Sequence, residues 1–176
     1  MYFTKEYRQE VDQILREMDP KLRELIEDIW EQILEDKLEL ISQCETPIEK
    51  LLVVPLSEMV KKLNSYRDSI VEANCLPQEN ISCYSKSYRV DFLIQVLLSN
   101  DYTLQFVIEC DGHDYHEKTK EQARKDRQRE RHLQNAGYIV IRFTGSEIYE
   151  DPYSCCDEVE GIILKTVDKL NLLNYL

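Results

Sequence analysis

The chain has 176 residues, 43% of them hydrophobic and 32% charged, and a formal net charge of −12. This length suffices to bury a core, and the composition is typical of a soluble globular protein. No apolar run approaches the roughly 18 residues of a membrane span, and residues 1–6 do not open a signal peptide, so we expect a cytoplasmic protein without membrane contact. The charge argues against a generic nucleic-acid coat protein, whose phosphate affinity depends on basic side chains.

Residues 1–44 are predicted to form two helices, the second beginning at Asp19 and Pro20, an N-cap residue followed by a proline suited to the first turn. Apolar residues recur along this second helix at helical spacing: Leu22, Leu25, Ile26, Ile29, Trp30, Ile33, Leu34, Leu38 and Ile41. This stripe must be covered by the rest of the chain, by a second copy in a homodimer or by a partner protein. We treat residues 1–44 as a helical extension and residues 45–176 as the main domain.

The next helix is predicted to begin at Thr46, because Thr46 and Glu49 have the spacing of a capping box. Pro55 is expected to interrupt or kink this helix. Residues 64–87 are mostly polar and predict a loop, with the first strand at Ile81–Tyr84.

Residues 88–98 and 103–110 are rich in β-branched and aromatic residues and flank the turn formers of residues 99–101, which predicts a β-hairpin. If the turn centres on Asn100, opposed residues have numbers that sum to 200. One face is then wholly apolar and must be buried. It consists of Val90, Phe92, Ile94 and Val96 opposite Cys110, Ile108, Phe106 and Leu104.

On the other face of this hairpin, Asp91 lies opposite Glu109, and Arg89 lies opposite Asp111. Directly opposed carboxylates have Cβ atoms about 5 Å apart and repel each other. A hard cation such as magnesium would explain the pair, because it takes several oxygen ligands, including carboxylates. Two alternatives stay open: the carboxylates share a proton, or Arg89 neutralises them as an ordinary ion pair.

A basic helix is predicted from about Glu117 to Ala136. Residues 117–131 contain seven Lys or Arg and four Asp or Glu, so this segment is positive in an acidic chain. Such a helix beside carboxylates can hold phosphates near a metal, although a solvated helix with local ion pairs is an equally simple explanation. The stripe expected to meet the sheet is Thr119, Gln122, Asp126, Arg129, Leu133 and Ala136.

The remaining elements follow from local signals. Gly137 suits a helix C-cap, and residues 138–143 read as a strand with Arg142 on the face opposite its apolar residues. Asp151 and Pro152 begin the last helix, whose core stripe is Cys155, Cys156, Val159, Ile162, Ile163 and Val167. The six cysteines include no C-x-x-C pair, so zinc is not expected and reduced core thiols are the default.

These residues carry a resemblance to a known family. Asp91 followed one hairpin later by Glu109 resembles the PD-(D/E)xK nuclease superfamily. A longer pattern is similar to small endonuclease-like domains related to very-short-patch-repair endonucleases: residues 109–117, Gln122, Asp126, Arg129, Leu133, Gly137 and residues 142–148. The resemblance covers about residues 45–150. It implies an α/β fold with a restriction-endonuclease-like core of helix, three strands, helix, strand and helix, preceded by the helical extension.

The resemblance further implies a metal-dependent endonuclease that hydrolyses phosphodiester bonds, with DNA as the expected substrate. Asp91 and Glu109 would bind Mg²⁺ or Mn²⁺, assisted by Glu49 or Asp111. The other residues expected in the site are His116 and Gln122, which would orient the nucleophile or a phosphate oxygen, and Lys118, Lys120, Arg129 and Arg142, which would contact nucleic acid.

The chain departs from the superfamily pattern at two positions. Val90 replaces the motif proline, and Asp111 replaces the motif lysine, the cation credited with orienting the attacking water. Lys118 or Lys120 would be near enough to supply that cation. The missing lysine and the acidic charge also favour a catalytically inactive relative that binds nucleic acid or a partner protein. A third hypothesis is an interaction protein that uses the acidic residues 1–44 as a phosphate mimic.

Overall fold

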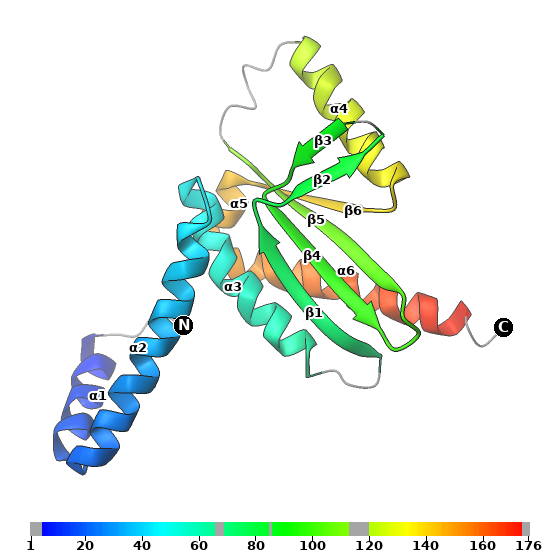
Figure 1. Ribbon diagram of the computed structural model, residues 1–176. Coiled ribbons are helices and arrows are strands. Elements are labelled where there is room, and N and C mark those ends of the chain that lie inside the picture. Colours follow the sequence, from blue (N-terminus) through cyan, green and yellow to red (C-terminus); the bar gives the residue numbers. More distant parts are fainter. Residues whose placement is uncertain (1–4, 66–68, 85, 113–119, 174–176) are drawn as a thin grey trace. The chain divides into compact units, whose positions relative to one another are not determined.

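The computed structural model describes residues 5–65, 69–84, 86–112 and 120–173 (Figure 1). The chain divides into two compact units, Met1–Glu39 and Leu40–Leu176. Among the described residues, no helix is both long enough and apolar enough to cross a membrane.

The N-terminal unit is built from α1 (Lys5–Glu17) and most of α2 (Pro20–Ser42), as predicted. Asp19 caps α2, since its Oδ1 accepts hydrogen bonds from the backbone N–H groups of Lys21 at 2.9 Å and Leu22 at 3.4 Å. Arg23 ties the two helices together by donating to the carbonyl oxygens of Leu15 and Arg16. The apolar residues of α2 stay about half exposed: Leu22, Leu25, Ile29, Trp30, Ile33, Leu34 and Leu38.

The second unit is organised around a four-stranded sheet with the order β1-β4-β5-β6. Its strands are β1 (Ile70–Pro77), β4 (Phe92–Leu98), β5 (Thr103–Asp111) and β6 (Ile139–Thr144). Neighbouring strands are antiparallel except β5 and β6, which are parallel. A parallel pair needs a long crossover, and α4 (Lys120–Asn135) lies within this one.

The β4–β5 hairpin has the predicted register. Its pairs run from Phe92 opposite Ile108 to Leu97 opposite Thr103, so the paired numbers sum to 200. Asn100 lies at the turn, where its side-chain oxygen accepts a hydrogen bond from the Tyr102 N–H. Hydrophobic alternation therefore fixed this register correctly, because a one-residue slip would have turned Phe92, Ile94 and their partners away from the core.

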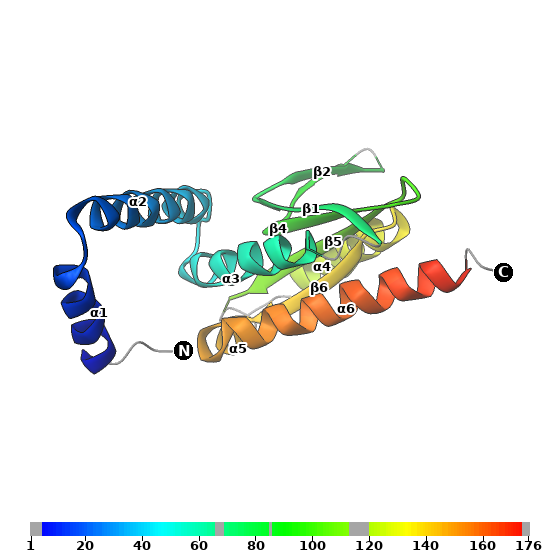
Figure 2. The ribbon, with the colours of Figure 1, turned by 90° about the horizontal axis from the view of Figure 1, so that it is seen from below.

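Helices cover both faces of the sheet (Figures 1 and 2). The larger core joins α3 (Pro47–Leu63) and α6 (Pro152–Leu173) to the face that carries Phe92, Ile94 and Phe106. A smaller core on the opposite face joins Leu133 of α4 to Leu93 and Val107. The predicted helical face of α4 is thus confirmed at Leu133, which is fully buried.

Two predictions before this hairpin were wrong: the loop at residues 70–77, and the hairpin strand at residues 88 and 89. Residues 70–77 are not loop but form β1, while Asn80–Cys83 (β2) pairs with Lys86–Arg89 (β3) in a separate two-stranded sheet. β1 is an edge strand that buries only Ile70 and Ala73, and its pairing shifts between Ile70 and Glu72, so the alternation that signals a strand is broken. The predicted strand at Ile81–Tyr84 is present as β2, whereas β1, β3 and the short α5 (Gly145–Glu150) are additions to the predicted element order.

Val90 was also assigned to the wrong face. It belongs to the smaller core with Leu93 and Val107, although the predicted register placed it beside Phe92. The reason is that the chain leaves the sheet before β4: the Val90 N–H donates to the Glu79 carbonyl, beside the β2–β3 hairpin.

The other local predictions hold, except at Pro55. α3 runs unbroken through Pro55, so the predicted interruption is absent. Gly137 follows α4 with a φ of 94°, as expected of a C-cap glycine. Asp151 caps α6 through hydrogen bonds from the N–H groups of Tyr153 and Ser154. All six cysteines are free thiols.

Candidate functional site

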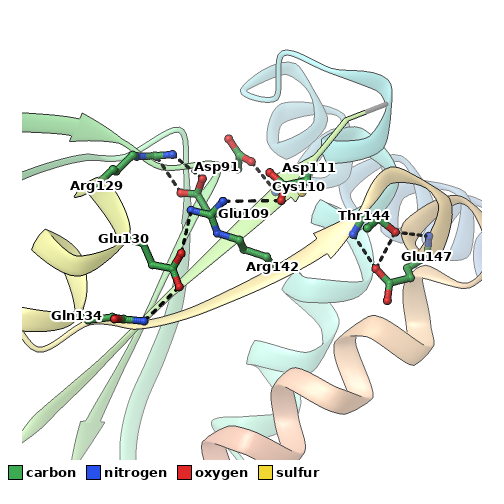
Figure 3. A network of polar contacts seen from close by, with 10 residues as sticks. All are labelled: Asp91, Glu109, Cys110, Asp111, Arg129, Glu130, Gln134, Arg142, Thr144 and Glu147. Carbon is green, nitrogen blue, oxygen red and sulfur yellow. Dashed lines mark hydrogen bonds and ion pairs between the residues drawn. The ribbon is translucent and has the colours of Figure 1, made fainter. Parts of the chain in front are cut away.

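The hairpin brings Asp91 and Glu109 together at the end opposite its turn, where β4 begins and β5 continues beside β6. Phe92 of β4 pairs with Ile108 of β5, and Asp91 and Glu109 are the next residues outward on each side. The Cys110 N–H donates to Asp91 Oδ2 at 2.7 Å, which holds the Asp91 carboxylate against β5 (Figure 3). Glu109 is only 5% exposed and Asp91 is partly buried, so this is a desolvated pair of carboxylates.

Arg129 of α4 binds both oxygens of Glu109 (Figure 3). Its Nη1 donates to Oε2 at 2.7 Å and its Nη2 to Oε1 at 2.8 Å, the two-pronged geometry that makes arginine–carboxylate pairs strong and directional. Nη2 also donates to the backbone carbonyl of Arg89. The cation that neutralises Glu109 is therefore Arg129, whereas Arg89 pairs with Glu45 at 2.6 Å and not with the hairpin carboxylates.

Burial raises the pKa of Glu109 to about 7, although the charge of Arg129 acts in the opposite direction. The negative charge of Asp91 raises it further. A carboxylate that keeps a high pKa beside an arginine lies in a strongly desolvated, negatively charged setting. Such a setting suits a bound cation.

The pKa of Asp91 is raised for the same reason. Burial is the largest cause, the hydrogen bond from the Cys110 N–H opposes it, and the negative charges of Glu49 and Asp111 add to it. Asp91 thus lies among carboxylates, and its ionised form is costly in the folded protein.

The raised pKa of Glu109 predicts a pH-dependent stability. Its folded pKa of about 7 exceeds the unfolded value of 4.5, so the folded state holds the proton more tightly. The resulting stabilisation is complete below pH 4.5 and is lost as the pH rises through 7, by roughly 3 kcal/mol in total. In chelator, the free energy of unfolding of the native chain, measured with urea, should fall by this amount relative to that of Glu109→Gln between pH 4.5 and pH 8. Parallel pH profiles for the two proteins would contradict the assignment.

Asp111 and Arg142 lie beside the carboxylate pair on β5 and β6. Arg142 Nη1 is 3.8 Å from Asp111 Oδ2, and its Nη2 is 3.9 Å from Glu130 of α4 (Figure 3). The Nε of Arg142 is buried and has no hydrogen-bond partner within the described part of the chain. Arg142 thus makes only long ion-pair contacts at the edge of the site and keeps one N–H donor without a partner among the described residues.

Glu49 lies at the start of α3, where it completes the predicted capping box. Its carboxylate accepts hydrogen bonds from the N–H groups of Glu45 and Thr46, the Thr46 hydroxyl and Gln78 Nε2, all at 3.3 Å or less. Four donors occupy the acceptor positions of one carboxylate. Glu49 is close enough for its charge to affect Asp91, but its oxygens are used locally.

Loss of this cap should weaken the domain. Thr46→Ala removes the hydroxyl that accepts from the Glu49 N–H and donates to the Glu49 carboxylate, so we expect a loss of about 1 kcal/mol in the free energy of unfolding. Thr166→Ala is a matched control, because the Thr166 hydroxyl only donates to the Ile162 carbonyl within α6. Urea denaturation measures both. Equal stability of the two variants would show that the cap contributes nothing.

The remaining predicted residues lie at or beyond the start of α4. His116 and Lys118 fall outside the described residues. Lys120 begins α4, and Gln122 is an exposed residue of its first turn. The structure thus gathers Asp91, Glu109 and Arg129, with Asp111 and Arg142 nearby.

No ready-made metal cage is visible in the described ranges: no three His, Cys, Asp or Glu side chains there are arranged to hold a metal ion. The donor chemistry nevertheless suits a hard cation, because Asp91, Glu109 and Asp111 are all carboxylates, and the pKa of Asp91 and Glu109 is raised by burial and by neighbouring negative charges.

A pocket of about 350 Å³ lies elsewhere, between the end of β6, α5 and α6. Its lining residues are Phe143, Glu147, Glu150, Asp151, Ser154, Cys155 and Glu158. Four carboxylates repel a phosphate backbone, so this pocket is a poor nucleic-acid site.

The pairing of Arg129 with Glu109 was not predicted, because Arg129 was expected to contact nucleic acid. One signal was present: Arg129 is the only basic residue in the stripe of α4 expected to face the sheet. A nearly buried Glu109 on that sheet would require a cationic partner.

Comparison with known proteins places the chain in a family. No curated protein and no solved structure matches it. A family model described as REase_MTES_1575 matches residues 65–163, more than half of the chain, and this span contains Asp91, Glu109, Asp111, Arg129 and Arg142. The chain belongs to this restriction endonuclease-like family.

Proposed function

We propose that this protein is a metal-dependent endonuclease that hydrolyses phosphodiester bonds, with DNA as its substrate. The observation that carries the proposal is the desolvated pair Asp91 and Glu109 at the end of the β4–β5 hairpin, in a chain of a restriction endonuclease-like family. The negative charge of Asp91 raises the pKa of Glu109, so the two carboxylates repel each other, and a cation that relieves this repulsion is useful in phosphodiester hydrolysis.

The residues of the site would have separate roles in binding the metal and the phosphate. Asp91 and Glu109 would hold Mg²⁺ or Mn²⁺, and Asp111 is better placed to assist than Glu49, whose oxygens are occupied by the α3 cap. Once bound, the ion would supply positive charge at the phosphate and activate the attacking water. Arg142, whose Nη contacts with Asp111 and Glu130 are long, would bind a phosphate oxygen.

Binding to a polyanion also needs positive charge outside the carboxylate pair. The exposed side of α4 carries Arg124, Lys125, Arg127 and Arg131, and residues 117–131 are net positive in an otherwise acidic chain. These side chains would attract the nucleic acid towards this end of the domain, and the acidic remainder would limit binding elsewhere. His116, Gln122, Lys118 and Lys120 remain candidates for orienting the nucleophile or a phosphate.

A cleavage panel tests the proposal. The native protein would be incubated with single- and double-stranded DNA and RNA in magnesium, manganese or chelator. We expect cleavage of DNA that chelator abolishes. Metal-dependent cleavage of RNA alone would refute DNA as the substrate. Absence of cleavage on every substrate would refute the proposed nuclease activity.

The alternative is a nuclease-like module that binds nucleic acid or a partner protein without hydrolysis. It is favoured by one observation: the carboxylate oxygens of Glu109 are both engaged by Arg129, as in a structural ion pair. Such a module would retain nucleic-acid binding without cutting, and Asp91→Asn would leave that binding intact.

A further inference from the structure

Arg129 holds Glu109 with a geometry that leaves little room for another ligand. Two guanidinium nitrogens bind the two carboxylate oxygens at 2.7 and 2.8 Å, and the side chain is 24% exposed against 7% for Glu109. The pair joins α4 to β5, two elements that meet across the smaller core.

A divalent cation at Asp91 and Glu109 would have to bind carboxylate oxygens that now accept hydrogen bonds from protein N–H groups. Asp91 Oδ2 accepts from the Cys110 N–H, and both Glu109 oxygens accept from Arg129. Of these contacts, the arginine is the one that can move without any change in the backbone.

A guanidinium and a divalent cation cannot both lie within about 3 Å of one carboxylate without strong repulsion, since both are positively charged and the site is poorly solvated. Arg129 is partly exposed and reaches Glu109 through a long, flexible side chain. Its displacement therefore requires only a change of rotamer.

We propose that Arg129 occupies the place of the divalent cation on Glu109 in the metal-free protein and leaves Glu109 when the cation binds. The inference rests on the proposed function for its choice of ion. Arg129 is then a positioning residue: it holds the Glu109 carboxylate in place, lowers the affinity of the site for metal and, once displaced, presents a two-pronged phosphate donor beside the ion. The missing motif lysine at Asp111 leaves Arg129 as the cation in contact with Glu109.

A manganese titration tests this exchange, with free Mn²⁺ measured by electron paramagnetic resonance in the absence of nucleic acid. We expect Arg129→Gln to bind Mn²⁺ about tenfold more tightly than the native chain. Arg129→Lys keeps the charge but loses the two-pronged contact, so its affinity should fall between the two. Arg142→Gln is the matched control, because it removes one positive charge beside Asp111 without touching the Glu109 oxygens, and it should tighten binding by less than about threefold.

Three results would overturn the exchange: equal affinity of Arg129→Gln and native protein, an equal gain in Arg142→Gln, or no Mn²⁺ binding by any of these proteins. If Arg129→Gln does not fold, ¹⁵N spectra of the arginine side chains in the native protein replace it. The Arg129 Nη groups should rotate slowly in chelator and freely with Mg²⁺, and a spectrum unchanged by Mg²⁺ would refute the exchange. These readouts do not involve cleavage, so their failure is distinct from failure of the nuclease.

Discussion

Asp91→Asn is expected to abolish metal-dependent cleavage and leave the protein at least as stable as the native chain. The amide can still accept the Cys110 N–H, so the local geometry survives. It is a poorer ligand for a hard cation, and the loss in rate should exceed the roughly 100-fold typical of changes to groups that merely support a metal ligand. Single-turnover cleavage in magnesium measures this loss.

Ionised Asp91 is expected to lower the stability of the folded protein. The pKa of Asp91 is raised in the folded state, so its ionised form costs stability once the pH exceeds the unfolded pKa, and the cost is complete above the folded pKa. Asparagine removes the charge and its repulsion from Glu49 and Asp111. The melting temperature of Asp91→Asn at pH 7.5 in chelator should equal or exceed that of the native chain. A clearly lower melting temperature would mean that Asp91 is an ordinary structural carboxylate.

Arg129→Met should be the most destabilising change in the site, and its cost should depend on pH. Removing one partner of a buried ion pair leaves the other charge uncompensated, which costs about 3 kcal/mol when Glu109 is ionised. At pH 5 Glu109 is protonated, because its folded pKa is about 7 even with Arg129 present. The cost should therefore be small at pH 5 and approach its full value at pH 8, as measured by urea unfolding in chelator.

Arg124→Met is the matched control for this comparison. Arg124 lies on the same helix and pairs with Glu121 at 3.1 Å, but both side chains are more than half exposed. Exposed pairs contribute little, so this variant should show a small effect at both pH values. A cost for Arg129→Met that is the same at pH 5 and pH 8 would contradict the link to Glu109.

The β4–β5 hairpin could be predicted because its turn residues and its apolar alternation indicate the same register. Phe92, Ile94, Phe106 and Ile108 must share one face, and this requirement puts Asp91 and Glu109 next to the last pair of the hairpin, Phe92 and Ile108. The caps at Thr46, Asp19 and Asp151 could be predicted for a similar reason, since each joins residues a few positions apart.

The rest of the site depends on contacts that no local pattern encodes. The pairing of Arg129 with Glu109 joins residues 20 positions apart across a helix and a strand. Arg129 is the only basic residue in the stripe of α4 expected to face the sheet, but no local pattern pairs it with Glu109. β1 escaped prediction because an edge strand buries few side chains, and the new face of Val90 follows from the β2–β3 hairpin beside it.

The central claim is that Asp91 and Glu109 together support metal-dependent hydrolysis. The most direct test compares cleavage of double-stranded DNA by the native chain, Asp91→Asn and Glu109→Gln, each in magnesium and in chelator. We predict chelator-sensitive cutting by the native chain that both variants lose. Cutting by either variant at the native rate, or cutting that chelator does not affect, would contradict the claim.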